Sequence, residues 1–312
     1  MPALSDIVHA QRRIAAHLQP TPLEIAPGLA PNIYLKLENA NKTHSFKIRG
    51  ALNAILSLDD SAREHGIIAA SSGNHAQGVA YAANSAGIRA QILMPEHTPQ
   101  RKVNGVKQWG ADAILYGANY DETEAEALRR SRDEQIAFVS PYNDPHIIAG
   151  AGTIGLEIIA QLPQVERVIV PVSGGGLISG VALAIKYMQP HAEVIGVNAE
   201  SAPSMYNHFH NTQKIEVWET LAEALSGAVE VGSITIPITL EYVDNIVTVT
   251  EAQIADAMRW MVTTQGWIAE GGGVVGVAAL LNNIIPVDDR PTVVVISGGN
   301  IDAETLKDVL CG

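Results

Sequence analysis

The chain is poor in cysteine, in aromatic residues and in positive charge. Its 312 residues include a single cysteine, Cys311, and only 5% Phe, Trp and Tyr. One cysteine cannot form an internal disulfide, which favours a reducing compartment. Lys and Arg number 20 against 33 Asp and Glu, giving a net charge of −13. Such a surface repels phosphate backbones and anionic lipids, so neither nucleic acid nor a membrane is an expected partner.

Long apolar runs and the motifs of several enzyme classes are also missing. No uncharged apolar run reaches the ~18 residues of a membrane helix. The N-terminus, MPALSDIVHAQRR, lacks the basic start and apolar core of a signal peptide. There is no GxxxxGK[ST] phosphate loop, no pair of cysteines and no HExxH motif. We therefore expect a cytoplasmic enzyme or binding protein.

The pattern that is present alternates short apolar runs with amphipathic stretches. The predicted strands are Ile33–Leu37, Ile67–Ala70, Gln91–Met94, Ala113–Leu115, Ala137–Val139, Val168–Val172, Val194–Val197, Ile246–Val249 and Val293–Ile296. The predicted helices are Ser5–Gln19, a helix carrying Lys47, Ala76–Ala86, Pro99–Trp109 with Thr98 as N-cap, Glu122–Glu134, Ile147–Gln161, Ile178–Met188, Glu251–Gln265 and Val274–Asn283. Thr250 and Gln253 form a predicted capping box, and residues 200–238 have no clear period. This alternation predicts a parallel sheet covered by helices, and the length favours two domains.

The segment His44–Gly50 contains the first candidate for chemistry, Lys47. The lysine falls in the first turn of a predicted helix whose other faces are apolar. Burial and the positive helix end both disfavour the ammonium, so the pKa of Lys47 is expected to be lowered. The free amine is the form needed for a Schiff base. The alternative is a lysine that extends to solvent.

Three further segments follow predicted strands directly. The turn Ser71–His75 collects backbone N–H groups before a helix, which suits a carboxylate or phosphate, although ordinary N-capping gives the same pattern. Three glycines after Ser173 let the backbone wrap around an anion, and the helix dipole adds attraction. We favour a phosphate site there over a plain turn. Ser297-Gly298-Gly299 lies at the carboxyl edge of a strand, where α/β ligands bind, or forms a tight turn.

Together and in this order, the four segments resemble the threonine/serine dehydratase and serine racemase family. These are pyridoxal-phosphate (PLP) enzymes with the fold named after the tryptophan synthase β-subunit, fold type II. The resemblance runs from Thr21 to Asn300. Further matching stretches are Lys36-Leu37-Glu38-Asn39, Ile148-Ala149-Gly150-Ala151-Gly152-Thr153, Ile246-Val247-Thr248-Val249 and Glu270-Gly271-Gly272.

The resemblance implies an α/β fold with two open twisted sheets flanked by helices. It places a large PLP-binding domain at residues 1–65 plus 142–312 and a small, mobile domain at residues 66–141. The cofactor would lie between the two lobes. An amino acid would be the substrate, and the assembly would be a homodimer or homotetramer.

The resemblance also implies pyridoxal 5′-phosphate as cofactor and a role for each matching residue. Lys47 would bind the cofactor covalently and later remove the Cα proton. Ser72 would lie on the opposite face of the substrate. Cofactor contacts are expected from Phe46, Asn74, Ser173, Gly174, Gly175, Gly176, Leu177, Glu270, Ser297 and Gly298. The substrate would be held by Ser71, Ser72, Gly73, Asn74 and His75.

The expected reaction is α,β-elimination from a small hydroxyamino acid, giving a 2-oxo acid and ammonia. The resemblance places Asn74 at the cofactor's 3′-oxygen and Ser297 at its ring nitrogen. Serine stabilises a pyridinium poorly, which disfavours a long-lived carbanion and suits elimination. The alternative on the same scaffold is a serine or hydroxyaspartate racemase/dehydratase. A nicotinamide dehydrogenase would need GxGxxG after an early strand with an acid about 20 residues on, and no such pair occurs.

Several positions depart from the family pattern. His44 replaces a usual glycine and either narrows the site or caps the helix, and we favour the cap. Glu223-Ala224 stands where Asp-Gly is usual, so the substrate-side loop is expected to differ. Glu200 matches the first acid of metal-binding members, but Met205 and Tyr206 stand where acids are expected, so no metal is predicted. The length leaves no room for a C-terminal regulatory domain, so isoleucine feedback is not expected.

Overall fold

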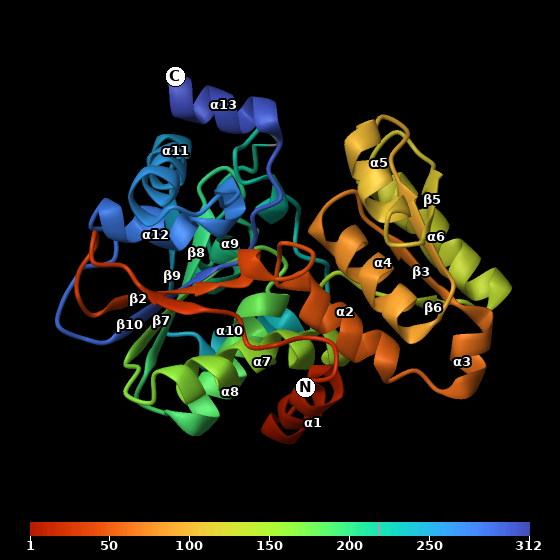
Figure 1. Cartoon of the computed structure of the whole chain (residues 1–312), viewed down its shortest axis with the longest axis horizontal. Coiled ribbons are helices and arrows are strands. Elements are labelled where there is room, and N and C mark those ends of the chain that lie inside the picture. Colours follow the sequence, from red (N-terminus) through yellow and green to blue (C-terminus); the bar gives the residue numbers. More distant parts are fainter. Residues whose placement is uncertain (218) are drawn as a thin grey trace.

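The computed structural model describes residues 1–217 and 219–312 and contains two separate sheets flanked by helices (Figure 1). The larger sheet has six strands in the order β1-β2-β10-β7-β8-β9. The smaller sheet has four strands in the order β5-β4-β3-β6. The predicted fold class, two open sheets covered by helices, is confirmed.

The larger sheet is built from both ends of the chain. Its strands are β1 (Leu23–Ile25), β2 (Ile33–Leu37), β7 (Arg167–Pro171), β8 (Glu193–Ala199), β9 (Asn245–Val249) and β10 (Thr292–Ile296). All neighbours pair in parallel except β1, which runs antiparallel to β2. Ile296 lies opposite Leu37, so the segments that follow β2 and β10 leave the sheet side by side.

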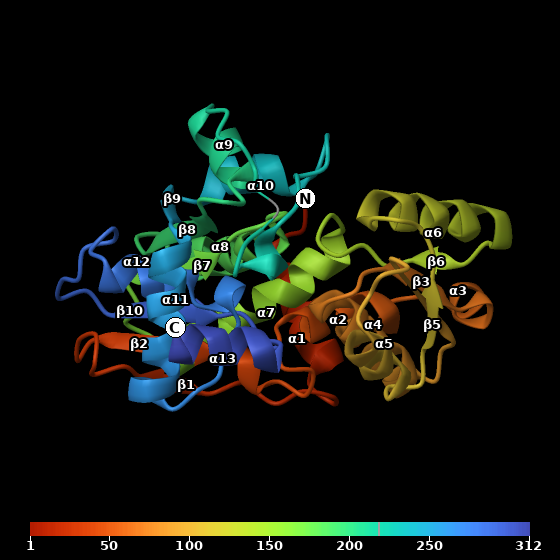
Figure 2. The same cartoon turned by 90° about the horizontal axis from the view of Figure 1, so that it is seen from above.

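The smaller sheet comes from one continuous stretch of chain. Its parallel strands are β3 (Ile67–Ala70), β4 (Ala90–Met94), β5 (Asp112–Leu115) and β6 (Ala137–Phe138). The helices of this stretch are α3 (Asp60–His65), α4 (Asn74–Ala86), α5 (Gln100–Lys107) and α6 (Tyr120–Glu134). Helix α6 covers one face and α4 and α5 cover the other (Figure 2). Successive strand residues accordingly alternate, with Ile67 packed in the α4 core and Ile68 in the α6 core.

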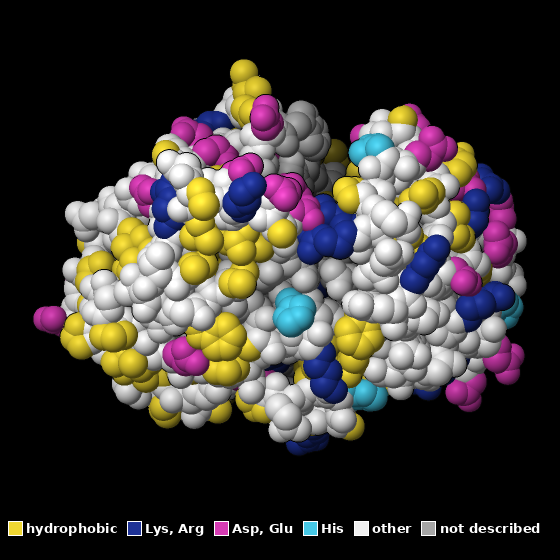
Figure 3. Space-filling model, turned by 45° about the horizontal axis from the view of Figure 1, so that its top comes forward, with side chains coloured by type: hydrophobic (Ala, Val, Ile, Leu, Met, Phe, Trp, Pro, Cys, Tyr) yellow, Lys and Arg dark blue, Asp and Glu magenta, His cyan; other side chains and the backbone are white. Residues whose placement is uncertain are grey.

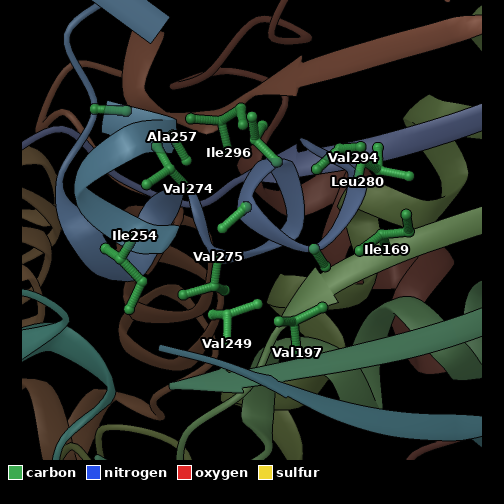
Figure 4. Close-up of a cluster of buried hydrophobic side chains, with 14 of the residues drawn as sticks. Ile169, Val197, Val249, Ile254, Ala257, Val274, Val275, Leu280, Val294 and Ile296 are labelled. Carbon is green, nitrogen blue, oxygen red and sulfur yellow. The ribbon is translucent and has the colours of Figure 1, made fainter. Parts of the chain in front are cut away.

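The remaining helices of the chain lie outside this stretch. They are α1 (Leu4–Ile14), α2 (Lys47–Leu56), α7 (Pro145–Gln161), α8 (Gly176–Met188), α9 (Ser204–His210), α10 (Thr235–Tyr242), α11 (Glu251–Trp260), α12 (Val275–Leu281) and α13 (Ala303–Cys311). Short 3-10 turns are η1 (Glu38–Ala40), η2 (Glu223–Leu225) and η4 (Gly271–Gly273), and η3 (Met261–Gln265) is a π-helical turn. Branched side chains of the strands pack against α11 and α12 in a buried cluster (Figure 4).

Helix α7 packs unusually close to its neighbours. Residues 150–155 spell GxGxxG, but they lie in the middle of α7 rather than after a strand. A β-carbon on Gly150 would lie 2.6 Å from the carbonyl oxygen of Arg49 in α2. These glycines therefore serve backbone-to-backbone helix packing and do not form a dinucleotide loop.

Several predicted boundaries need correction. Helix α1 ends at Ile14, not Gln19, because His17 bonds back to Ile14 in a tighter turn. Thr98 does not cap α5, which begins at Gln100 after an extended Pro99. Residues 200–238, whose sequence shows no clear period, contain α9 and the start of α10. The Thr250–Gln253 capping box is confirmed. Within the described residues no helix is long and apolar enough to cross a membrane.

Candidate active site

A cavity of about 1710 Å³ lies between the two lobes and gathers all four candidate segments. Lys, Arg and His side chains lie along the seam between the lobes (Figure 3). The predicted residues on the cavity wall are Phe46, Lys47, Ser71, Ser72, Gly73, Asn74, His75, Ser173, Gly174, Gly175, Gly176, Leu177, Glu270 and Ser297. Residues as far apart in sequence as Phe46 and Ser297 thus share one cavity.

Lys47 is the first residue of α2, and its position is fixed by the segment that follows β10. Phe46 donates its backbone N–H to the Ser297 carbonyl at 3.0 Å, and Ser45 forms a bridge with Gly298. The Lys47 amine donates to the Pro141 carbonyl at 2.8 Å. Burial lowers the pKa of Lys47 to about 8, while Glu270 acts in the opposite direction. The predicted direction of this shift is confirmed.

The segment Ser173–Leu177, here called the glycine loop, joins β7 to α8. Its glycines have no room for side chains. Gly175 adopts φ 87°, which favours glycine, and a β-carbon there would lie 2.6 Å from the Met205 methyl. A β-carbon on Gly174 would lie 2.5 Å from the Tyr142 ring. The first N–H groups of α8 have no partner within the helix. The loop therefore offers a compact anion site on the cavity wall.

A short chain of side-chain hydrogen bonds crosses the cavity floor. Asn74 donates from Nδ2 to Glu270 Oε1 at 2.6 Å, and Asn300 donates to Asn74 Oδ1 at 2.7 Å. Burial raises the pKa of Glu270 to about 7, although the Asn74 hydrogen bond opposes the shift. Gly298 is not part of the cavity wall; a β-carbon there would collide with the Glu270 carboxylate.

The turn Ser71–His75 joins β3 to α4. Gly73 donates its backbone N–H to Ser71 Oγ at 3.2 Å. His75 is buried, and its Nε2 lies 2.9 Å from the Val139 carbonyl. Burial and the charge of Lys47 together lower the pKa of His75 to about 3. The imidazole is therefore neutral, with its proton on Nε2, because a carbonyl can only accept.

Comparisons of the sequence and of the structure with known proteins agree on one family. Residues 14–298 match the family model described as pyridoxal-phosphate dependent enzyme. The chain belongs to this family. It is 45% identical to an L-threonine ammonia-lyase of Thermotoga maritima, over 99% of this chain and 78% of that protein. It is also similar in structure to maize serine racemase, with TM-score 0.92, 32% identity and coverage of 98% and 96% of the two chains. A processed threonine deaminase of Solanum lycopersicum gives TM-score 0.90, 34% identity and coverage of 99% and 89%. The architecture is PLP fold type II, and the protein is a PLP-dependent enzyme.

The cavity residues fit pyridoxal phosphate. The cofactor needs an amine for its aldehyde, an anion site for its phosphate and a narrow space for its ring. Lys47 supplies an amine of lowered pKa, and the glycine loop supplies backbone N–H groups at a helix start. Ser297 and Asn74 line the same cavity. These groups lie together on its wall, as the cofactor requires.

Other cavity residues were not predicted from the sequence. Tyr120 and Glu124 of α6 share a 2.8 Å hydrogen bond, and Tyr142 packs behind the glycine loop. Lys102 of α5 lies 3.3 Å from Glu223 across the cavity. Glu223 could be suspected from its departure from the family pattern. The others carry no local motif, because only the tertiary fold brings them to the cavity.

The structure shows where two of the departures from the family pattern lie. His44 was expected to cap the helix, and this is wrong: α2 has Phe46 at its N-cap and no side-chain cap bond. His44 instead lines the cavity. Glu200 lies 3.4 Å from Lys214. Across residues 1–217 and 219–312, no group of three His, Cys, Asp or Glu could hold a metal ion.

Proposed function

We propose that the protein is a threonine/serine ammonia-lyase that converts a hydroxyamino acid to a 2-oxo acid and ammonia. The observation that carries the proposal is the Lys47 amine of lowered pKa in one cavity with the glycine loop and Ser297. The relative of Thermotoga maritima named L-threonine ammonia-lyase, at 45% identity over nearly the whole chain, supports threonine as a substrate.

The cavity residues divide between holding the cofactor and tuning it. When bound, pyridoxal phosphate supplies an electron sink for the charge that develops at Cα. The loop Ser173–Leu177 would hold the phosphate, Asn74 the 3′-oxygen, and Phe46 and Glu270 the ring. Ser297 lines the same cavity and would meet the ring nitrogen with an uncharged hydroxyl, which would favour departure of the β-hydroxyl.

Lys47 would act as the general base once the substrate amine has displaced it. Its amine is neutral over much of the range above pH 8 because burial lowers the pKa of the group. The turn Ser71–His75 would hold the substrate carboxylate on the backbone N–H groups at the start of α4. His75, being neutral and bonded through Nε2 to the Val139 carbonyl, would add no charge to this part of the site.

The test is a panel of hydroxyamino acids assayed for 2-oxo acid formation, with chiral analysis of the remaining substrate. We expect oxo acid and ammonia in equal amounts from L-threonine and L-serine. Failure to form oxo acid from any hydroxyamino acid by a yellow, borohydride-reducible holoenzyme would contradict the proposal.

A second candidate is an amino acid racemase, favoured by the similarity to maize serine racemase and by Ser72 on the cavity wall. Elimination from an L-amino acid needs a proton removed from one face only. Racemisation also needs a proton delivered from the opposite face, which we assign to Ser72. We therefore predict that Ser72→Ala abolishes D-serine formation but retains slower oxo acid formation from L-serine.

Both products of this variant are measured in one sample by chiral chromatography and an oxo acid assay. Surviving D-serine formation would remove Ser72 from the opposite face. Complete loss of L-elimination would instead place Ser72 among the groups that hold the substrate.

We also propose the domain division and the assembly. Residues 66–141, which contain all four strands of the smaller sheet, would form the mobile small domain, and residues 1–65 plus 142–312 the large one. A homodimer or homotetramer is expected from the resemblance. Analytical ultracentrifugation of the holoenzyme tests the assembly, and a monomer at micromolar concentration would contradict it.

A further inference from the structure

His44 has a backbone conformation that normally belongs to glycine. Its φ is 55°, in the left-handed region, where a β-carbon crowds the following carbonyl. Both its backbone groups are engaged: the N–H donates to the Asn41 carbonyl at 2.8 Å, and the carbonyl accepts from Gly299 at 2.9 Å. The same pairing continues through Ser45 and Phe46 to fix Lys47. The conformation of residue 44 is therefore imposed by the element that positions Lys47.

A glycine would adopt this conformation without strain. The presence of a histidine here therefore calls for an explanation in terms of its side chain. Strained residues that persist at a ligand cavity are commonly part of its function. The His44 side chain is exposed and lines the cavity, and it does not cap α2. It is thus available to a ligand.

The neighbours of His44 indicate which part of a ligand it meets. Asn300 donates one amide hydrogen to the Thr43 carbonyl at 2.8 Å and the other to Asn74 Oδ1 at 2.7 Å. Residue 44 is thereby tied to the start of α4, where the turn Ser71–His75 lies. Asn74 Nδ2 donates one hydrogen to Glu270, and the proposed function assigns the other to the cofactor's 3′-oxygen, so Asn74 has no hydrogen left for a carboxylate.

We infer that His44 is a substrate-binding residue that donates a hydrogen bond from its imidazole to the substrate carboxylate. It acts beside the backbone N–H groups of the turn. The inference rests on the proposed function, which assigns the substrate carboxylate to that turn. A glycine at this position would leave the carboxylate to the turn and to solvent.

The test compares two ligands on the holoenzyme, L-threonine and L-threoninamide, which differ only at the carboxylate. Binding is read as the initial change in the visible absorbance of the cofactor in stopped flow, independently of turnover. We expect His44→Gly to weaken L-threonine about tenfold, the scale of one charge-assisted hydrogen bond. Binding of L-threoninamide should change less than twofold.

Two further variants control for strain and for folding. His44→Asn tolerates the left-handed conformation and keeps a donor, so it should recover most of the L-threonine affinity. Gln135→Gly relieves the same kind of strain, since Gln135 has φ 56°, but Gln135 is not among the cavity residues; it should leave affinity unchanged. Equal weakening of both ligands, or unchanged affinity for L-threonine, would overturn the inference. Normal titrations without oxo acid would instead reject the proposed function and leave His44 in place.

Discussion

At the scale of the residue, burial rather than a neighbouring cation makes the Lys47 amine reactive. Loss of solvation is the main cause that lowers its pKa, and the Glu270 carboxylate, which would favour the ammonium, only partly opposes it. Glu270 is itself held near its own titration point, because burial raises its pKa to about 7. The site therefore holds two ionisable groups whose pKa values both lie close to physiological pH.

The lowered pKa of Lys47 predicts how cofactor attachment depends on pH. Only the neutral amine attacks the cofactor aldehyde, so the attachment rate in the apo protein should rise up to about pH 8 and then level off. An ordinary lysine would give a rise that continues toward about pH 10.4. Stopped-flow absorbance of apo protein mixed with pyridoxal phosphate measures the profile. Lys47→Ala should abolish the absorbance change that accompanies attachment, whereas Lys42→Ala on the exposed loop should retain it.

The tight packing of the glycine loop predicts that a carboxylate introduced there will greatly weaken cofactor binding. Gly175→Asp adds a side chain where even a β-carbon meets Met205 and Thr235, and it sets negative charge beside the phosphate. We expect cofactor affinity to fall at least tenfold, measured by titration of the apo protein. Gly232→Asp is the matched control: Gly232 also has positive φ, 79°, but nothing lies within 4 Å. Equal loss in both variants would mean that strain, not phosphate contact, is responsible.

The sequence predicted which residues line the site better than it predicted the side chains that they contact. Lys47, Ser71–His75, the glycine loop and Ser297 lie in short motifs next to strands, and all line one cavity. The Asn74–Glu270 bond joins residues 196 positions apart, and Tyr142 meets the glycine loop only through tertiary packing. His44 was misread as a cap, because its left-handed backbone is imposed by Asn41 and Gly299.

At the scale of the element, a buried charge network anchors the helix that begins with Lys47. Arg49, fully buried in α2, bonds to Glu38 at 2.7 Å and to Glu157 at 2.6 Å. Lys36 of β2 completes the network, 2.6 Å from Glu157. Two cations thus balance two carboxylates in a region without solvent. The network joins β2, η1, α2 and α7 beneath the site.

Removing the central cation should be costly. Arg49→Met leaves Glu38 and Glu157 buried with only Lys36 nearby, so we expect a loss of about 3–5 kcal/mol in the free energy of unfolding. Urea denaturation of the holo protein measures the loss. Arg129→Met, which breaks ion pairs of a largely exposed arginine on α6, should cost less than about 1 kcal/mol. Similar losses in the two variants would contradict the role given to the network.

Strands were predictable because long branched runs identify them, whereas short or irregular elements were not. Strands β2 and β3 match their predicted bounds, Ile33–Leu37 and Ile67–Ala70. The three-residue strand β1 is too short for a period to show, and it forms only because β2 offers a free edge. The helix predicted over 251–265 changes to a π-helical turn at Met261, a change of hydrogen-bonding register that apolar spacing does not reveal.

At the scale of the whole molecule, two ion pairs connect the lobes at the cavity rim. Lys102 of α5 faces Glu223 of η2, and Arg101 of the same helix pairs with Asp302 before α13. Both pairs are partly exposed, so each contributes little to stability. Their position suits a different task, because they join the substrate-side loop and the start of α13 to the lobe that carries the turn Ser71–His75. We propose that they hold the lobes closed over the substrate.

This proposal predicts how substrate affinity depends on salt. At low ionic strength the Debye length is long, and the pairs favour the closed state; between 0.02 and 0.5 M salt they are progressively screened. We expect the KM for L-threonine to rise about threefold across this range in the wild-type protein. The double variant Arg101→Gln, Lys102→Gln should start at the higher KM and stay there. Tetramethylammonium chloride serves as the salt, so that binding of a small metal cation does not affect the result.

Arg129→Gln, whose ion pairs lie within α6, should keep the wild-type salt dependence. A double variant that still responds to salt would show that closure does not depend on these pairs. Loss of the response in Arg129→Gln would show that it reflects overall charge.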